Sequence, residues 1–203
     1  MPPTTIIRKL DLVEYQPTYE AMQQFTAQRH SQTNDEIWLL QHPPVFTLGR
    51  NTLPEHLTPQ SEISVIPIDR GGQISYHGPG QLVVYLLLDL KRLKMGVREL
   101  VHNVERSIIS VLGLYAIDAY RKKDAPGVYV DNAKIAALGF RIKHGYSYHG
   151  LSLNIDMDLT PYQRINPCGY PDLVVTDLKQ LGVSASFNTI EDQLSSMLIQ
   201  NLR

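Results

Sequence analysis

The stretch Arg70–Gln81, RGGQISYHGPGQ, decides how the rest of this chain is interpreted. A β-branched run ending at Ile68 precedes it and the apolar run Leu82–Leu88 follows it, and both runs are predicted to be buried strands. Glycines between two core strands indicate positive φ or a close approach of the backbone to a ligand. We therefore interpret the stretch as a backbone cradle that carries Arg70 and His77. The alternative is an ordinary tight connection.

Composition restricts the class of protein. The chain has 203 residues, of which 43% are hydrophobic and 19% are charged, and its net charge is −1. These values predict one globular domain over residues 1–203 and argue against nucleic-acid binding. Neither a membrane span nor a signal peptide is recognisable. The single cysteine, Cys168, cannot form an internal disulfide, so we expect a cytoplasmic protein.

The pattern of apolar residues predicts many strands and few helices. The predicted helices are Pro17–His30, Val97–Leu112 with Gly113 as its C-cap, and a terminal helix begun by a capping box of Asn188 and Glu191. The predicted strands are Thr5–Val13, Glu36–Gln41, Val45–Leu48, Ile63–Ile68, Leu82–Leu88, Leu114–Tyr120, Gly127–Val130, Lys134–Ile142 and Ser147–Met157, with a turn at Asp131 and Asn132. This order predicts an α+β fold in which helices pack on a mixed or antiparallel sheet.

Few residues in the recognisable motifs have side chains that could act in catalysis. Cys168 lies among Asn, Pro and Gly residues, which suits a loop, and it is either a reactive thiol or a buried small side chain. A nucleophilic cysteine needs a partner that stabilises its thiolate, and the candidates are His77, His149 and Lys134. Lys134 alone is indistinguishable from a solvated lysine, and His149 from a structural histidine. The sequence predicts no metal site and no cofactor, since zinc-binding spacings are absent.

Four motifs together resemble one family, the lipoyl(octanoyl) transferases, whose fold is that of the biotin and lipoate protein ligases. They are RGGQISYHGPGQ from Arg70, DAPGVYVDNAKIAALG from Asp124, HGLSLN from His149 and RINPCGY from Arg164. Ser75 stands where the family usually has Thr, and Ser152 stands where Ala is common. The second difference bears on acyl-chain preference.

The resemblance implies the fold and the site residues. It implies a mixed sheet flanked by helices around an acyl tunnel. It implies that Cys168 is the nucleophile that forms an acyl-thioester and that Lys134 is its acid–base partner, which lowers the pKa of the thiol. It also implies that the following residues contact the substrate: Arg70, Gly71, Gly72, Gln73, Ile74, Ser75, Tyr76, His77, Ala137, Leu138, Gly139, Gly150, Leu151 and Ser152.

The activity implied is transfer of an octanoyl group from octanoyl-acyl carrier protein to a lysine of a lipoyl domain. The implied acceptors are the lipoyl domains of 2-oxoacid dehydrogenase E2 subunits and the glycine cleavage H protein, and the enzyme is expected to be a monomer. The main alternative is an ATP-dependent lipoate or biotin protein ligase, which would not need Cys168. Two others are an inert module that binds a carrier protein, and a Cys-His hydrolase that uses His77 or His149.

Overall fold

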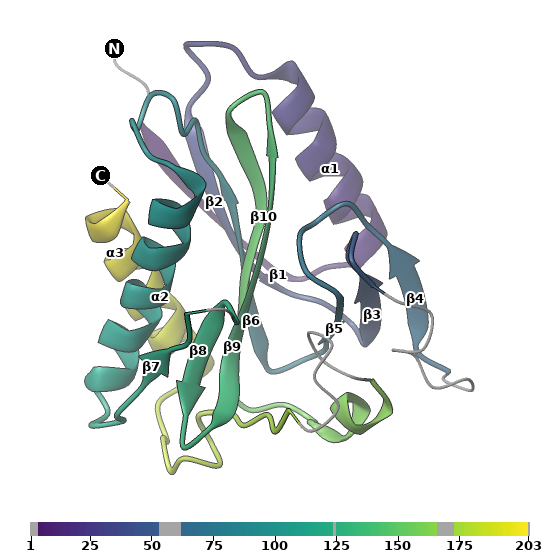
Figure 1. Cartoon of the computed structure of the whole chain (residues 1–203), viewed down its shortest axis with the longest axis vertical. Coiled ribbons are helices and arrows are strands. Elements are labelled where there is room, and N and C mark those ends of the chain that lie inside the picture. The colour runs from purple at the N-terminus through teal and green to yellow at the C-terminus, as the bar shows by residue number, and fades with distance from the viewer. Residues whose placement is uncertain (1–3, 53–61, 124, 166–172, 203) are drawn as a thin grey trace.

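A seven-stranded sheet forms the centre of the molecule (Figure 1). The computed structural model describes residues 4–52, 62–123, 125–165 and 173–202. The strand order is β1 (Thr5–Leu12), β2 (Asp35–Gln41), β6 (Gln81–Leu87), β10 (Tyr146–Asn154), β9 (Ala133–Lys143), β8 (Gly127–Val130) and β7 (Tyr120–Arg121). β1 and β2 pair in parallel, and the other neighbours pair antiparallel. The predicted mixed sheet is therefore confirmed.

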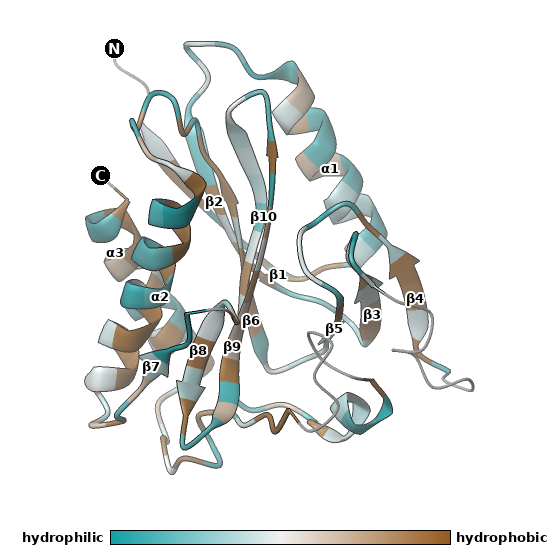
Figure 2. Ribbon diagram, viewed as in Figure 1, coloured by the Kyte–Doolittle hydropathy of each residue, from teal (hydrophilic) through white to brown (hydrophobic). Residues whose placement is uncertain are grey.

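Helices cover both faces of this sheet. α2 (Val97–Gly113) and α3 (Phe187–Asn201) pack on one face, and α1 (Tyr15–Gln28) packs on the other. β6 explains why two layers form, because alternate side chains of a strand point to opposite faces. Leu82, Val84 and Leu86 join the core under α2 and α3, whereas Val83, Tyr85 and Leu87 join the core under α1. In Figure 2 the central strands are accordingly the more hydrophobic part and the outer sides of the helices the more hydrophilic part.

A small sheet stands beside the α1 face. Its strand order is β4 (Ser64–Pro67), β3 (Val45–Leu48) and β5 (Ile74–His77), and the 3₁₀ helix η2 (Thr160–Arg164) lies against β5. Two expectations were wrong here. The strand before the glycine stretch is an exposed edge strand, since only β3 pairs with it among the described strands. A third of the glycine stretch is itself a strand, because residues 74–77 pair with β3.

Several predicted boundaries are confirmed and others are wrong. α2 is confirmed, and so is the hairpin turn at Asp131 and Asn132, where both residues have positive φ. The predicted strand Leu114–Tyr120 is wrong: the chain continues from α2 in tight turns and reverses at Ala116, whose φ is 57°. Gly113 is therefore the last residue of α2 and not its cap.

The start of the terminal helix also differs from the prediction. The side chain of Ser186 caps α3 by accepting a hydrogen bond from the backbone N–H of Thr189. Asn188 lies inside the first turn of the helix, so it cannot form the predicted capping box. Among the described residues, none of the helices combines the length and the apolar character that crossing a membrane needs.

Candidate active site

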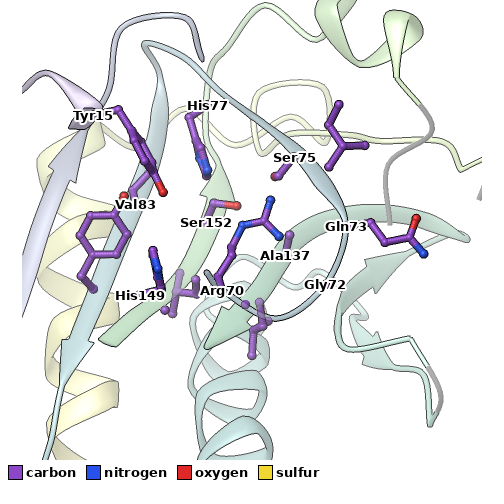
Figure 3. A pocket seen from close by; sticks show the side chains of 16 residues that line it. Tyr15, Arg70, Gly72, Gln73, Ser75, His77, Val83, Ala137, His149 and Ser152 are labelled. Carbon is purple, nitrogen blue, oxygen red and sulfur yellow. The ribbon is translucent and has the colours of Figure 1, made fainter. Parts of the chain in front are cut away.

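One pocket gathers most of the predicted substrate contacts. It lies on the α1 face of the sheet, between β6, β9 and β10 and the segment that leads into β5 (Figure 3). Its lining includes Arg70, Gly72, Gln73, Ile74, Ser75, His77, Ala137, Leu138, Gly139, Gly150, Leu151 and Ser152, all of which the resemblance implied. Tyr15, Val83, Tyr85 and His149 complete it. The first three were not anticipated as site residues, because aromatic and aliphatic side chains in such positions are equally typical of a core.

Two glycines allow close contacts around the pocket, one with the glycine stretch and one between β10 and β6. Gly139 on β9 and Gly150 on β10 are register partners. A Cβ at Gly139 would lie 3.0 Å from Arg70 Cδ, and a Cβ at Gly150 would lie 2.0 Å from the carbonyl oxygen of Val84. The N–H of Gly71 also donates to the carbonyl of Phe140 at 3.0 Å. Close approach of backbone to backbone is thus one reason for the glycines here.

Gly71 and Tyr76 are not in the lining of this pocket. Gly71 contributes its backbone contact to β9 instead. β5 alternates, so Tyr76 points away from Ser75 and His77. Its ring packs against Phe46 and Tyr162, with ring centroids 5.5 Å apart in both pairs. The role of Gly71 and Tyr76 as substrate contacts remains a prediction.

Arg70 reaches the middle of the pocket, where Figure 3 shows it near His77, Ser152 and Ala137. Its Nη2 donates to the carbonyl and the hydroxyl of Thr47, at 3.0 and 2.8 Å, and its Nη1 donates to the carbonyl of Gly71 at 3.0 Å. These bonds tie the guanidinium to β3 and hold it across the glycine stretch. The arginine is therefore positioned before any ligand binds.

The neighbouring Asp69 has different partners. It accepts hydrogen bonds from Tyr19 at 2.9 Å, from the hydroxyl of Tyr148 and from Nε2 of His149 at 3.1 Å. Burial alone would raise the pKa of Asp69, but the bonds from His149, Tyr148 and Tyr19 outweigh it and hold the pKa well below its usual range. Asp69 thus fixes the ring of His149, which lines the pocket.

Two further histidines stay neutral because they are buried. Burial and the neighbouring His42 lower the pKa of His77 to about 3, although its Nδ1 is hydrogen-bonded to Gln81 at 2.7 Å. Burial lowers the pKa of His42 to about 4, and its ring bonds to the carbonyl of Val13 and the hydroxyl of Tyr85. At neutral pH these rings can accept or donate a hydrogen bond but carry no charge.

Lys134 lines a second pocket that adjoins the first. The two pockets share Ile74, Ser75, Ala137 and Ser152. The Lys134 side chain is buried, its Nζ donates to the carbonyl of Pro126 at 3.3 Å, and it lies 5.2 Å from the centroid of the Tyr129 ring. A buried lysine that lines a pocket is not the solvated lysine that its sequence context equally allowed.

Cys168 falls outside the described residues. Tyr162 and Val175, which lie on either side of it in the sequence, both line the Lys134 pocket. The backbone N–H of Lys134 donates to Val174 at 2.8 Å, and its carbonyl accepts from Thr176 at 3.1 Å. Within the described residues, no group of three or more His, Cys, Asp or Glu side chains is arranged to hold a metal ion.

Comparison with known proteins covers the whole chain. Residues 16–199 match the family model described as the lipoyl protein ligase A/B catalytic domain. The octanoyltransferase of Dechloromonas aromatica (strain RCB) is 54% identical over 202 residues, which are 100% of this chain and 98% of that protein. The octanoyltransferase of Chromobacterium violaceum is 56% identical over 197 residues, which cover 97% of this chain and 95% of that protein.

Solved structures match the fold at low sequence identity. A crystal structure of lipoate-protein ligase A bound with ATP has a TM-score of 0.75 at 12% identity and covers 100% of this chain and 86% of its own. A biotin protein ligase from Aquifex aeolicus in complex with biotin and ATP has a TM-score of 0.60 at 13% identity, with coverage of 98% and 70%. These matches confirm the predicted fold.

Proposed function

Because this chain belongs to the lipoyl protein ligase A/B catalytic domain family, we propose that it is an acyltransferase that moves an octanoyl group onto a lipoyl-domain protein. The observation that carries this proposal is the set of relatives named octanoyltransferase, which are 52–56% identical over nearly their whole length. The ligases share the fold at 10–14% identity, which supports a common architecture and not a common reaction.

The first half of the reaction uses Cys168 as the nucleophile. Its thiolate attacks the thioester carbonyl of the octanoyl donor, which we take to be octanoyl-acyl carrier protein. A bond forms between the Cys168 sulfur and the acyl carbon, and the bond from that carbon to the carrier thiol breaks. The ammonium of Lys134 favours the thiolate and then protonates the departing carrier thiolate. The burial of Lys134 beside the pocket supports this role.

The second half transfers the octanoyl group to a lysine. The amine of the acceptor lysine attacks the acyl-Cys168 carbonyl and forms the amide, and the Cys168 thiolate leaves. Neutral Lys134 takes the proton that the amine loses, so each half-reaction returns it to the state that the other needs. We propose lipoyl domains of 2-oxoacid dehydrogenase E2 subunits and the glycine cleavage H protein as acceptors.

The pocket provides for the acyl chain. The apolar side chains of Val83 and Ala137 can bury methylene groups at about 0.8 kcal/mol each, which gives chain length an energetic consequence. The two adjoining pockets support a chain that begins beside Lys134 and extends past Ala137. We further propose that residues 1–203 act as one catalytic domain, as a monomer, in the cytoplasm.

The experiment that tests the transfer is a comparison of two acyl sources. With octanoyl-acyl carrier protein and an apo lipoyl domain, we expect the mass of the acceptor to rise by one octanoyl group without ATP. With free octanoate, we expect no modification whether or not ATP is present. Modification that requires free octanoate and ATP would instead establish a ligase.

A further inference from the structure

The two pockets follow each other along the β9–β10 strand pair. Lys134 and Asn154 line one end, and the register partners Ala137 and Ser152 line both pockets. Gly139 and His149 belong to the other end. If the thioester carbonyl lies beside Lys134, as the proposed function requires, the ω end of the acyl chain extends toward His149 and Tyr15.

This far end carries polar side chains where a saturated chain would need none. Tyr15, His77 and His149 lie around it in Figure 3. All three are almost fully buried, with exposed fractions of 3%, 8% and 2%. A buried polar atom is costly unless it is paired, so the direction of each hydrogen bond decides what this end of the pocket can accept.

Tyr85, which is buried and lines the pocket together with Tyr15, ends a relay of directed hydrogen bonds. A backbone carbonyl can only accept, so Nδ1 of His42 donates to Val13, at 2.7 Å. Nε2 of His42 must then accept from the hydroxyl of Tyr85, also at 2.7 Å. The proton of Tyr85 is thereby used, so the oxygen of Tyr85 is left as an acceptor.

Gln81 determines which nitrogen of the His77 ring carries the proton. The amide nitrogen of Gln81 faces two acceptors, the carbonyl of Tyr76 at 3.3 Å and Oδ1 of Asn154 at 2.9 Å. Its Oε1 therefore faces His77, whose Nδ1 carries the proton and donates at 2.7 Å. Because burial keeps the ring neutral, with a pKa of about 3, Nε2 of His77 is an acceptor.

His149 repeats the arrangement on β10. Its Nε2 faces the carboxylate of Asp69 at 3.1 Å and must donate to it. Burial lowers the pKa of His149 despite the nearby Asp69, so the ring is neutral at pH 7 and Nδ1 carries a lone pair. Three side chains from β6, β5 and β10 thus commit their protons away from the pocket.

We propose, on the basis of the function proposed above, that Tyr85, His77 and His149 form a hydrogen-bond-accepting end wall. This wall admits medium-chain acyl groups that carry a hydroxyl on the ω carbon, in addition to the plain octanoyl group. The hydroxyl can donate a hydrogen bond to the wall, which a methyl group cannot do. An apolar end wall would do the opposite, because it would bury the hydroxyl without a partner.

The test compares two donors in the loading step. Octanoyl- and 8-hydroxyoctanoyl-acyl carrier protein are mixed with the enzyme, and the acyl-enzyme is followed by intact mass. We expect 8-hydroxyoctanoyl to load within about threefold of the octanoyl rate, whereas an apolar wall should slow it by roughly tenfold to a hundredfold. Tyr85→Phe and His77→Phe each remove an acceptor and should lower the ratio of the two rates by about fivefold or more.

The ratio is measured within each variant, so a general loss of folded protein cancels. The matched control is Tyr120→Phe, whose hydroxyl bonds to Asn132 on the surface, away from the pocket. Wild-type discrimination of tenfold or more against the hydroxyl overturns the end wall while octanoyl loading still supports the transferase. An unchanged ratio in both variants also overturns it. Loading of both donors without transfer to a lipoyl domain contradicts the proposed function alone, and loading of neither contradicts both.

Discussion

Asp69 links the folded state to pH through the hydrogen bonds that it accepts from Tyr19, Tyr148 and His149. Its folded pKa is depressed below the ordinary value of 3.8, so it contributes stability that is present above about pH 4. That contribution is lost as the pH falls through the folded pKa. We expect Asp69→Asn to reduce the free energy of unfolding at pH 6 and the deficit to shrink toward pH 2.5. Urea unfolding across this range measures it, with exposed Asp118→Asn as control, and a deficit independent of pH would contradict the assignment.

Replacement of Lys134 can test its catalytic role separately from its contribution to the stability of the fold. Lys134→Met keeps an apolar stem of similar length in the buried site and removes the ammonium. If Lys134 moves the protons of both half-reactions, the octanoyl transfer rate should fall by about a hundredfold or more. The control is Lys179→Met, which removes an exposed ammonium paired with Asp156. Transfer by Lys134→Met within tenfold of the wild-type rate would exclude the acid–base role.

Substitution of two glycines tests how closely individual elements are packed. At Gly150 a Cβ would lie 2.0 Å from the carbonyl oxygen of Val84, so Gly150→Ala must force β10 away from β6. We expect it to cost about 3 kcal/mol or more of unfolding free energy. At Gly113, the last residue of α2, a Cβ would have no neighbour within 4 Å, and Gly113→Ala should stabilise by about 0.4–1 kcal/mol. Thermal or urea unfolding gives both values, and equal effects would refute the packing described.

The N-terminus of α3 gives a second test at the level of a single helix. Ser186 supplies the cap, so Ser186→Ala should cost about 1 kcal/mol. Asn188→Ala, inside the first turn, should cost less than half of that. A larger effect at Asn188 would restore the capping box that the sequence predicted.

The local sequence pattern predicted those elements whose own residues indicate them, through apolar spacing or turn-forming residue types. α2 repeats apolar residues at intervals of three and four, and the turn at Asp131 and Asn132 uses residue types that tolerate positive φ. β5 has only four residues beside several glycines, and it becomes a strand only because distant β3 pairs with it. Tertiary pairing of this kind leaves no trace in a short window of sequence.

The candidate site, too, could be predicted only in part. The glycine stretch and the two strands of small residues could be associated through the resemblance, and the structure places twelve of those residues around one pocket. The directed hydrogen bonds of Tyr85, His77 and His149 could not be predicted. They depend on His42, Gln81 and Asp69, which reach them from other elements.

At the scale of the whole molecule, the two faces of the sheet have different tasks. The face under α2 and α3 is a continuous apolar core, whereas the face toward α1 and the small sheet holds the pocket. The strands between them serve both faces, since alternate side chains of β6 belong to one layer or the other. A site built on these strands is held by the same packing that stabilises the fold.

The most direct test of the proposed transferase is the mass of the enzyme after mixing with octanoyl-acyl carrier protein. We predict that the wild-type protein gains one octanoyl group, that hydroxylamine removes it, and that Cys168→Ala gains none. Addition of an apo lipoyl domain should then move the group from the enzyme to a lysine of that domain. An octanoyl adduct on Cys168→Ala, or lysine modification at the wild-type rate by that variant, would contradict an acyl-cysteine intermediate.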